Sequence, residues 1–422
     1  MFKNISILVS ASAAAQVLTV LSLPILSRLF DDTSFGIFQI YISTLNMLLM
    51  IAAMRYEMAI LAANTKFRYR NLVKIVFRLI LFMSGLSVVC CIVLWPFLYD
   101  LLGNLVDFLY FIPFMILVGG GFYAITHIVI REQEYKISAK SKLVQAMSYV
   151  LFGVLLGLGK FSVFGLVLAD LISKLISSLW LLLKLPQIGK LMFRPLNWVH
   201  AKLVAFRFKD YPTYALPGSL MSASIGLLVP VTFFAMYDLS VAGQYAIVER
   251  FVLLPVGVIA AAAGQVFTGD FSKQARMNDT NLNETFRYIV FRLLLIGIFP
   301  TLVLYLAGPE VVPFLFGSQW GLAGEICRIA APIALVRLVA GPVHMAIVAC
   351  GRQGLQLTWE VSRFLLTLAL FLIVMYLDFQ NPLDVMRIYV LSVVISYVSF
   401  LILADSVTKK RVSAIQLKFS EY

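Results

Sequence analysis

The side chains best able to do chemistry in this chain are charged residues inside long apolar runs. Arg337 lies near the middle of the run 323–350. A charge in hydrocarbon is costly, so it needs a partner or a water-filled cavity. Because a guanidinium can fork two hydrogen bonds onto a phosphate or carboxylate, Arg337 is the best single candidate for a cation lining a binding cavity. The alternative is a structural ion pair with a neighbouring helix.

Two further charge pairs lie in apolar runs. Glu249 and Arg250 fall about a third of the way into the run 241–267, and adjacent helical residues point about 100° apart. One of them could therefore line a cavity while the other pairs within its own half of the chain. Asp170 and Lys174 are four residues apart with the acid first, the favourable order for an ion pair on one helix. We expect this pair to neutralise itself, with ion coupling as the alternative role.

Two arginines lie near the ends of apolar runs, on the side expected to be external. Arg28 follows the run 5–26, and Arg328 lies near the start of the run 323–350. Either side chain could extend to the lipid headgroups or bind an anionic group that enters from outside. The sequence leaves both interpretations open.

Prolines interrupt two neighbouring apolar runs. Pro212, Pro217 and Pro230 lie in the seventh run, and Pro255 lies in the eighth. A proline inside a helix removes a hydrogen bond and bends the helix. We therefore expect kinks at Pro217, Pro230 and Pro255 that either serve as gating hinges or are static features of the packing.

The stretch 308–321 is rich in glycine and proline and ends near Trp320. Aromatic residues gather where a membrane protein meets the headgroups. This stretch is therefore expected to form an external turn with an aromatic anchor.

Composition indicates which elements hold these residues. Of the 422 residues, 61% are hydrophobic and 13% charged, whereas soluble domains have about 45–50% apolar and about 25% charged residues. Runs of about 20 apolar residues, enough to cross a bilayer as a helix, recur along the chain. We predict an all-α integral membrane protein with twelve transmembrane helices, over residues 5–26, 35–53, 75–98, 105–130, 143–158, 163–183, 211–236, 241–267, 289–306, 323–350, 361–377 and 388–404.

The basic residues of the loops predict the orientation. With these spans, 25 of the 34 Lys and Arg residues fall in alternate loops and at the two ends, and only Arg28, Lys160 and Arg387 fall in the opposite loops. Basic residues gather on the cytoplasmic side of membrane proteins. Both termini are therefore expected to be cytoplasmic, and the net charge of +13 is expected to favour anionic lipids.

Short repeats indicate that one membrane unit occurs twice. Three matches follow in the same order at offsets of 206 to 217: 75–79 with 289–293, 96–99 with 313–316, and 23–36 with 229–243. Six spans per half make the two repeats parallel, an arrangement found in carriers. The chain is therefore divided into a lobe over 1–183, a cytoplasmic linker over 184–210, a second lobe over 211–404 and a cytoplasmic tail over 405–422.

Several chemistries lack their sequence signals. The sequence contains no Gly-x-x-x-x-Gly-Lys-Ser/Thr loop for ATP and no Cys or His spacing typical of a metal site. The basic residues are dispersed over several loops, which argues against nucleic-acid binding. We expect no cofactor, no metal and no catalytic residue. The energy must come from a Na⁺ or H⁺ gradient, from a partner or from the gradient of the substrate.

Four stretches resemble a known family. They are 23–36 (LPILSRLF followed by FG), 54–60 (MRYEMAI), 243–255 (GQYA to Arg250, then LP) and 316–324 (FGSQWGLAG). Together, in this order, they are similar to the Wzx-type polysaccharide flippases of the multidrug/oligosaccharidyl-lipid/polysaccharide exporter superfamily. The resemblance covers nearly the whole chain.

The resemblance implies two six-helix lobes around a central cavity. It implies a flippase of the bacterial inner membrane that moves an undecaprenyl-diphosphate-linked oligosaccharide from the cytoplasmic to the external leaflet by alternating access. Arg250 and Arg337 would supply the cationic cavity, with Arg28 near the exit, and Arg55 with Glu57 would form a helix-end ion pair. The pathway implies a glycan polymerase and a chain-length protein as partners.

Two other functions are weighed against this one. A cation-coupled multidrug exporter of the same architecture would be expected to carry unpaired acids in its cavity, whereas the charges inside the spans are mostly basic. A membrane enzyme such as a polymerase would need an external loop with catalytic groups, and the external loops are short. His344 falls inside the tenth span, where we expect a packed, hydrogen-bonded side chain.

Overall fold

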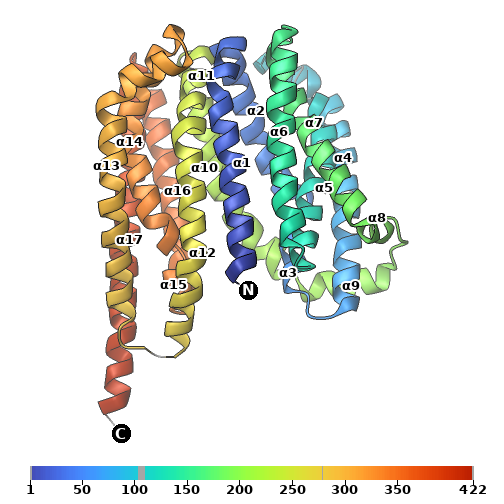
Figure 1. The fold of residues 1–422 in the computed structure, drawn as a ribbon, viewed down its shortest axis with the longest axis vertical. Coiled ribbons are helices and arrows are strands. Elements are labelled where there is room, and N and C mark those ends of the chain that lie inside the picture. Colours follow the sequence, from blue (N-terminus) through green and yellow to red (C-terminus); the bar gives the residue numbers. More distant parts are fainter. Residues whose placement is uncertain (1, 103–109, 278, 421–422) are drawn as a thin grey trace. The chain divides into compact units, whose positions relative to one another are not determined.

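The structure, a computed structural model, describes residues 2–102, 110–277 and 279–420. It divides into two compact units, Met1–Leu227 and Leu228–Tyr422. Long helices lie side by side within each unit (Figure 1). The helices of the first unit are α1 (Phe2–Leu29), α2 (Asp32–Ala52), α3 (Tyr56–Ala62), α4 (Lys66–Leu102), α5 (Ile112–Arg131), α6 (Tyr135–Leu158), α7 (Ser162–Lys184), α8 (Pro186–Met192), α9 (Trp198–Arg207), the π-helix η2 (Tyr211–Ala215) and the first part of α10 (Leu216–Met236).

The second unit begins inside α10. Its other helices are α11 (Leu239–Val248), the π-helix η3 (Glu249–Leu253), α12 (Leu254–Arg276), α13 (Leu282–Phe316), the short 3-10 helix η4 (Ser318–Trp320), α14 (Gly321–Val343), α15 (Ala346–Ala349), α16 (Gln353–Tyr376) and α17 (Pro382–Ser420). In this unit α14 packs against α12, α13 and α17, whereas in the first unit α6 packs against α1 and α7.

The expected all-α membrane fold is confirmed. Among the described residues, twelve helices are long and apolar enough to cross a membrane, and each overlaps one expected span. The seventh, Tyr211–Met236, agrees at both ends. Others are longer than expected, since α4 has 37 and α13 has 35 residues. Leu105, the expected start of the fourth span, lies outside the described residues.

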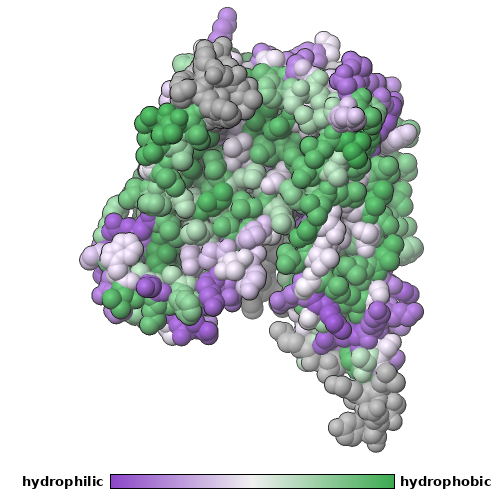
Figure 2. All heavy atoms as spheres, turned by 180° about the vertical axis from the view of Figure 1, so that it is seen from behind, coloured by the Kyte–Doolittle hydropathy of each residue, from purple (hydrophilic) through white to green (hydrophobic). Residues whose placement is uncertain are grey.

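The outward faces of the long helices are apolar. In α13, the side chains of Phe291, Leu295 and Phe299 are exposed. Figure 2 shows hydrophobic residues along the middle of the helices and hydrophilic residues near the helix ends. Exposed apolar surface on this scale requires hydrocarbon around it, so the chain is a multi-pass membrane protein.

The two halves begin their second helix in the same way. The carboxylate of Asp31 accepts a hydrogen bond from the Ser34 amide (3.1 Å) at the start of α2. The carboxylate of Asp238 accepts one from the Val241 amide (2.8 Å) at the start of α11. Each cap satisfies an amide that the helix leaves free. The two aspartates are 207 positions apart, within the range of offsets of the sequence repeats.

Two prolines coincide with π-helices. The Leu216 amide, directly before Pro217, bonds the Tyr211 carbonyl five residues back, and the Leu254 amide, directly before Pro255, bonds the Glu249 carbonyl in the same way. A proline ring clashes with the carbonyl four residues before it, and one wider turn relieves that clash. Pro217 and Pro255 thus shift the helical register, while Pro230 lies inside continuous α10.

The expected external turn over 308–321 is wrong for most of its length. Residues up to Phe316 continue α13, and the turn is confined to Gly317 and η4. Trp320 is fully buried and so does not anchor the protein in the headgroups. A Cβ at Gly324 would lie 2.9 Å from the Pro309 Cα, so this glycine lets α14 pack closely against α13.

Gln244 joins two of the family-like stretches. Its side-chain amide donates to the Gln319 carbonyl (2.9 Å) and its side-chain oxygen accepts from the Ala323 amide (2.9 Å). The second bond satisfies a free amide at the start of α14. The stretches around 243–255 and 316–324 therefore form one structural unit that fixes α11 against α14.

Candidate functional site

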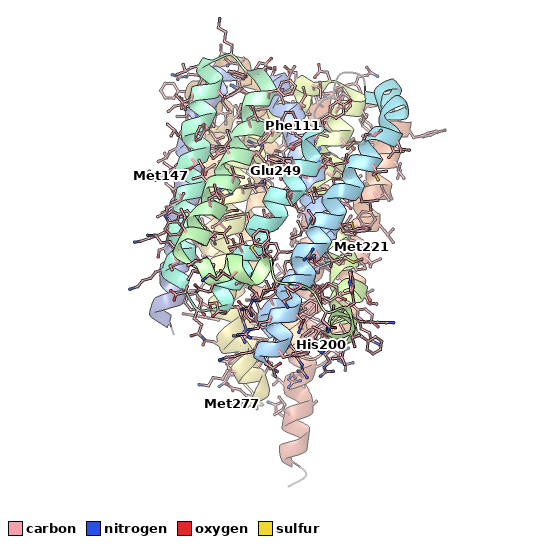
Figure 3. The ribbon with its side chains drawn as sticks, turned by 90° about the vertical axis from the view of Figure 1, so that its right-hand side faces the viewer. Phe111, Met147, His200, Met221, Glu249 and Met277 are labelled. Atoms are coloured by element: carbon pink, nitrogen blue, oxygen red, sulfur yellow. The ribbon has the colours of Figure 1, made fainter. Side chains whose placement is uncertain are left out.

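The π-helix η3 presents the first charged candidate. Glu249 is the first residue of η3 and is half-buried, well away from the helix ends (Figure 3). The hydroxyl of buried Tyr245, one turn earlier, donates a hydrogen bond to its carboxylate. Arg250 and Arg337 both interact electrostatically with Glu249. Glu249, at the start of the wider turn, therefore lies close to Arg337 of α14.

Arg337 is half-buried on α14 and lies among hydroxyls as well as the acid. It interacts electrostatically with Tyr389 and Tyr397 of α17, with Tyr245 and with Glu249. Tyr389 is buried and shares a hydrogen bond with Tyr245. The structure thus brings together three predicted residues, Arg337, Glu249 and Arg250, within the second unit.

The polar contacts continue from Tyr397 to the end of α14. The Arg363 guanidinium donates to the Tyr397 hydroxyl (3.1 Å) and pairs with Glu360 (3.2 Å). Glu360 lies 3.0 Å from His344, which also contacts the Gln356 amide (2.8 Å). We call the whole set the polar network of the second unit: Tyr245, Glu249, Arg250, Arg337, Tyr389, Tyr397, Arg363, Glu360 and His344.

The polar network combines cations, acids and hydroxyls within one unit. Three arginines (Arg250, Arg337 and Arg363) meet two acids (Glu249 and Glu360), so the bases are in excess. Tyrosine hydroxyls supply further hydrogen-bond donors. Groups of these types can bind a phosphate or carboxylate reversibly through the guanidinium groups. The carboxylates can bind and release a proton or a metal cation.

Asp170 and Lys174 form an ion pair in the first unit. The Lys174 ammonium donates to the Asp170 carboxylate at 2.6 Å, and both residues are buried on α7. Tyr41 interacts electrostatically with Asp170. The pair is neutral as a whole, which lowers the cost of placing it among helices.

Arg55 and Glu57 form an ion pair at a strained corner before α3. Their charged groups are 3.5 Å apart and Glu57 is buried. Met54 and Arg55 both adopt positive φ angles, 48° and 61°, which non-glycine residues rarely do. Burial raises the pKa of the Glu57 carboxyl, and Arg55 opposes this shift.

The two arginines near the expected outer ends lie on α1 of the first unit and on α14 of the second. Arg28 is exposed in the last turn of α1. Arg328 is paired with Glu325 (3.3 Å) and donates to the Tyr305 carbonyl (3.2 Å). The guanidinium of Arg328 is therefore engaged by α13 and α14.

Sequence reasoning missed much of the network. The expected eleventh span, 361–377, begins just after Glu360, whereas α16 contains both Glu360 and Arg363 well inside its first half. Their spacing of three, and the spacing of eight between Tyr389 and Tyr397, put each pair on one helical face. That pattern was the available signal. His344 is packed and hydrogen-bonded, as expected, where α14 ends beyond Pro342.

Metal binding has no structural support in the described part of the chain. No group of three or more His, Cys, Asp or Glu side chains is close enough there to hold a metal ion.

Comparison with solved structures defines the fold class. The chain is similar to the inward-facing conformation of a multidrug resistance MATE family transporter of the MOP superfamily (TM-score 0.68, 14% identity, 97% of this chain and 95% of that one). It is also similar to the lipid II flippase MurJ in an inward closed conformation (TM-score 0.66, 11% identity, 97% and 90%). An outward-facing MATE transporter gives a TM-score of 0.59 at 16% identity over 98% and 96%. The fold is that of these transporters and flippases.

A family model then identifies the chain more closely. The model described as polysaccharide biosynthesis protein matches residues 25–323. The chain belongs to this family, which confirms the resemblance drawn from the four motifs. No curated protein matches the sequence significantly.

Proposed function

We propose that this protein is a flippase that moves an undecaprenyl-diphosphate-linked oligosaccharide from the cytoplasmic to the external leaflet of a bacterial inner membrane by alternating access. The family match over residues 25–323 supports a role in polysaccharide biosynthesis. The fold shared with a lipid II flippase supports a lipid-linked glycan as the substrate class.

The observation that carries the proposal is the excess of guanidinium groups inside the second unit. Arg250 and Arg337 gather at Glu249, where a single arginine would neutralise the acid. The surplus charge suits a diphosphate, which is strongly anionic and accepts forked hydrogen bonds. The lipid tail would stay in the bilayer while the headgroup crosses.

The test uses a bacterial strain that lacks its own flippase and expresses this chain. The quantity measured is glycan display, the amount of glycan on the cell surface. Arg337→Ala and Arg250→Ala are expected to lower display at least about tenfold, the effect of losing about 1.4 kcal/mol of binding. Arg292→Ala is the matched control, since Arg292 is exposed on α13 and stacks on Tyr288 at 4.7 Å. Normal glycan display from both Arg337→Ala and Arg250→Ala, at equal abundance of the protein in the membrane, would contradict the proposal.

A cation-coupled multidrug exporter is the second candidate. The observation in its favour is the similarity to multidrug MATE transporters over the whole chain. In a drug-sensitive host, an exporter would raise resistance to cationic drugs, and Glu249→Gln would abolish that resistance. Restoration of glycan display without any gain in resistance would reject this candidate.

The driving force and the partners belong to the same proposal. A Na⁺ or H⁺ gradient would act through an acid such as Glu249, and the glycan polymerase and chain-length protein would receive the product outside. Dissipating each gradient separately during a display assay would show which one is used.

A further inference from the structure

The connection between α7 and α10 carries an apolar face that is exposed in the part of the chain that the structure describes. On α9, the side chains of Val199, Leu203 and Phe206 are 75%, 64% and 70% exposed. With about 100° per residue, these three lie within about 60° of one another on the helix. Exposing such a stripe to water would be costly for a surface helix of ten residues.

The opposite face of α9 is fixed to the protein. Ala201 and Val204 are buried in the core formed with α3, α4 and α5. The Tyr56 hydroxyl donates to the Ala205 carbonyl (3.2 Å), and Lys74 donates to the Pro195 carbonyl just before α9 (3.0 Å). The exposed stripe is therefore held in place rather than formed by a loose segment.

Basic residues flank the stripe on both sides. By the same helical geometry, Lys202 lies about 60° to one side of Val199 and Arg207 about 80° to the other, and both are exposed. Lys209 lies over the Phe206 ring at 4.7 Å. A helix with an apolar face bordered by cations is typical of a segment that lies in the headgroup region of a membrane.

The chain on either side places α9 at the membrane boundary. α7, a candidate span, ends at Lys184, and the next span begins at Tyr211, four residues after α9. In Figure 1, α9 runs across the direction of the long helices of its unit, and Figure 3 shows His200 of α9 near their end. Figure 2 shows hydrophobic and hydrophilic residues side by side at that end of the unit, at the lower left.

We propose that α9 is an anionic-lipid docking surface, in which Val199, Leu203 and Phe206 enter the leaflet and Lys202 and Arg207 bind lipid phosphates. Hydrophobic burial holds the stripe in the leaflet, and charge complementarity selects anionic headgroups. Docking fixes the segment that leads into η2 and Pro217 at the start of α10. This inference goes beyond the flippase proposal and does not depend on the glycan.

The test uses the full-length chain in nanodiscs of phosphatidylglycerol and phosphatidylcholine with brominated acyl chains. Trp198, exposed at the start of α9, reports contact with lipid, and subtraction of the Trp198→Phe signal isolates it. We expect stronger quenching as phosphatidylglycerol rises. Each basic residue near an anionic membrane contributes about fivefold to the affinity for it. The double variant K202Q/R207Q should therefore lower the preference for phosphatidylglycerol roughly 25-fold.

The matched control is K409Q/K410Q, which removes two exposed basic residues of α17 and should leave the Trp198 signal unchanged. Equal quenching in K202Q/R207Q and the unmodified chain would overturn the proposal. The proposal would also be overturned if the Trp198 signal changed only with protein concentration and the protein formed dimers at the same concentrations. That result would assign the stripe to contact with a second copy of the chain.

Discussion

At Glu249, one acid is held by two bases and a hydroxyl. The arrangement has two separable consequences, one for stability and one for binding. Removing only one partner of a buried pair leaves an uncompensated charge, whereas replacing both with neutral groups is often tolerated. The free energy of unfolding should therefore depend on whether Glu249 and Arg337 are paired. Glycan display should depend on whether the arginine is present to bind the substrate.

The variants that separate these effects are Arg337→Met, Glu249→Gln and the double variant. Arg337→Met is expected to lower the free energy of unfolding by about 3 kcal/mol, and Glu249→Gln added to it should restore most of that loss. Display should remain low in the double variant, because the guanidinium is still absent. Thermal unfolding in detergent and display measured together provide the check. Display that recovers with stability would assign the pair a structural role only.

Glu57 gives a prediction that depends on pH. Burial raises the pKa of its carboxyl above the ordinary 4.5, so the folded protein holds this proton more tightly than the unfolded chain does. The resulting stabilisation is complete below pH 4.5 and is lost as the pH rises through the raised pKa. Glu57→Gln should flatten this part of the pH profile and leave the variant more stable than the native chain at neutral pH. A Glu57→Gln variant that is less stable than the native chain at neutral pH would show that the Arg55 pair dominates.

Among the elements, the two π-helices have a physical cause that the sequence contained only in part. Pro217 and Pro255 were visible, but a proline alone predicts a kink, and Pro230 produces no π-helix. The register shift depends on whether the preceding amide can reach five residues back, which is a property of the folded backbone. For that reason the direction in which Glu249 points could not be derived from its position in the run.

Pro255→Ala tests whether the wider turn matters. Alanine allows ordinary α-helical bonding, so we expect stability to rise by about 1 kcal/mol while display falls, because residues before the turn rotate relative to those after it. Pro24→Ala in α1, where no π-helix occurs, is the control. Unchanged display in a protein shown to be more stable would mean that the turn does not position the site.

The number and placement of the membrane helices were predictable because long apolar runs have few other uses. The ends of these helices were less predictable. Both α4 and α13 continue beyond the apolar runs into polar and charged residues, which a search for apolar runs leaves out. The segment 184–210, which we expect to link the two lobes, contains α8 and α9, and their residues Ile188 and Val204 belong to a core of the first unit. The position of Trp320 could not be predicted, because a tryptophan near a turn can face either the lipid or the protein core. The packing of the folded chain determines which of the two occurs, and here Trp320 is buried.

For the whole molecule, the distribution of basic residues predicts cytoplasmic termini. Alkaline phosphatase fused after Lys160 or Arg387 should be active, because the enzyme requires the external compartment, and fusions after Arg207 or Lys410 should be inactive. The reverse pattern for β-galactosidase fusions provides the control. Activity of the phosphatase at Lys410 would imply an odd number of crossings and would contradict the twelve-helix arrangement.

Among the described residues, three acids meet a base inside their own unit: Glu57 meets Arg55 and Asp170 meets Lys174 in the first, and Glu249 meets Arg337 in the second. Recombination between two related genes at the boundary near Leu227 would thus keep both members of each pair in the same half of the new protein. Chimeras between distant relatives should assemble without orphaned charges. Each half can therefore accumulate changes on its own, and substrate preference can diverge in one half without waiting for a matching substitution in the other.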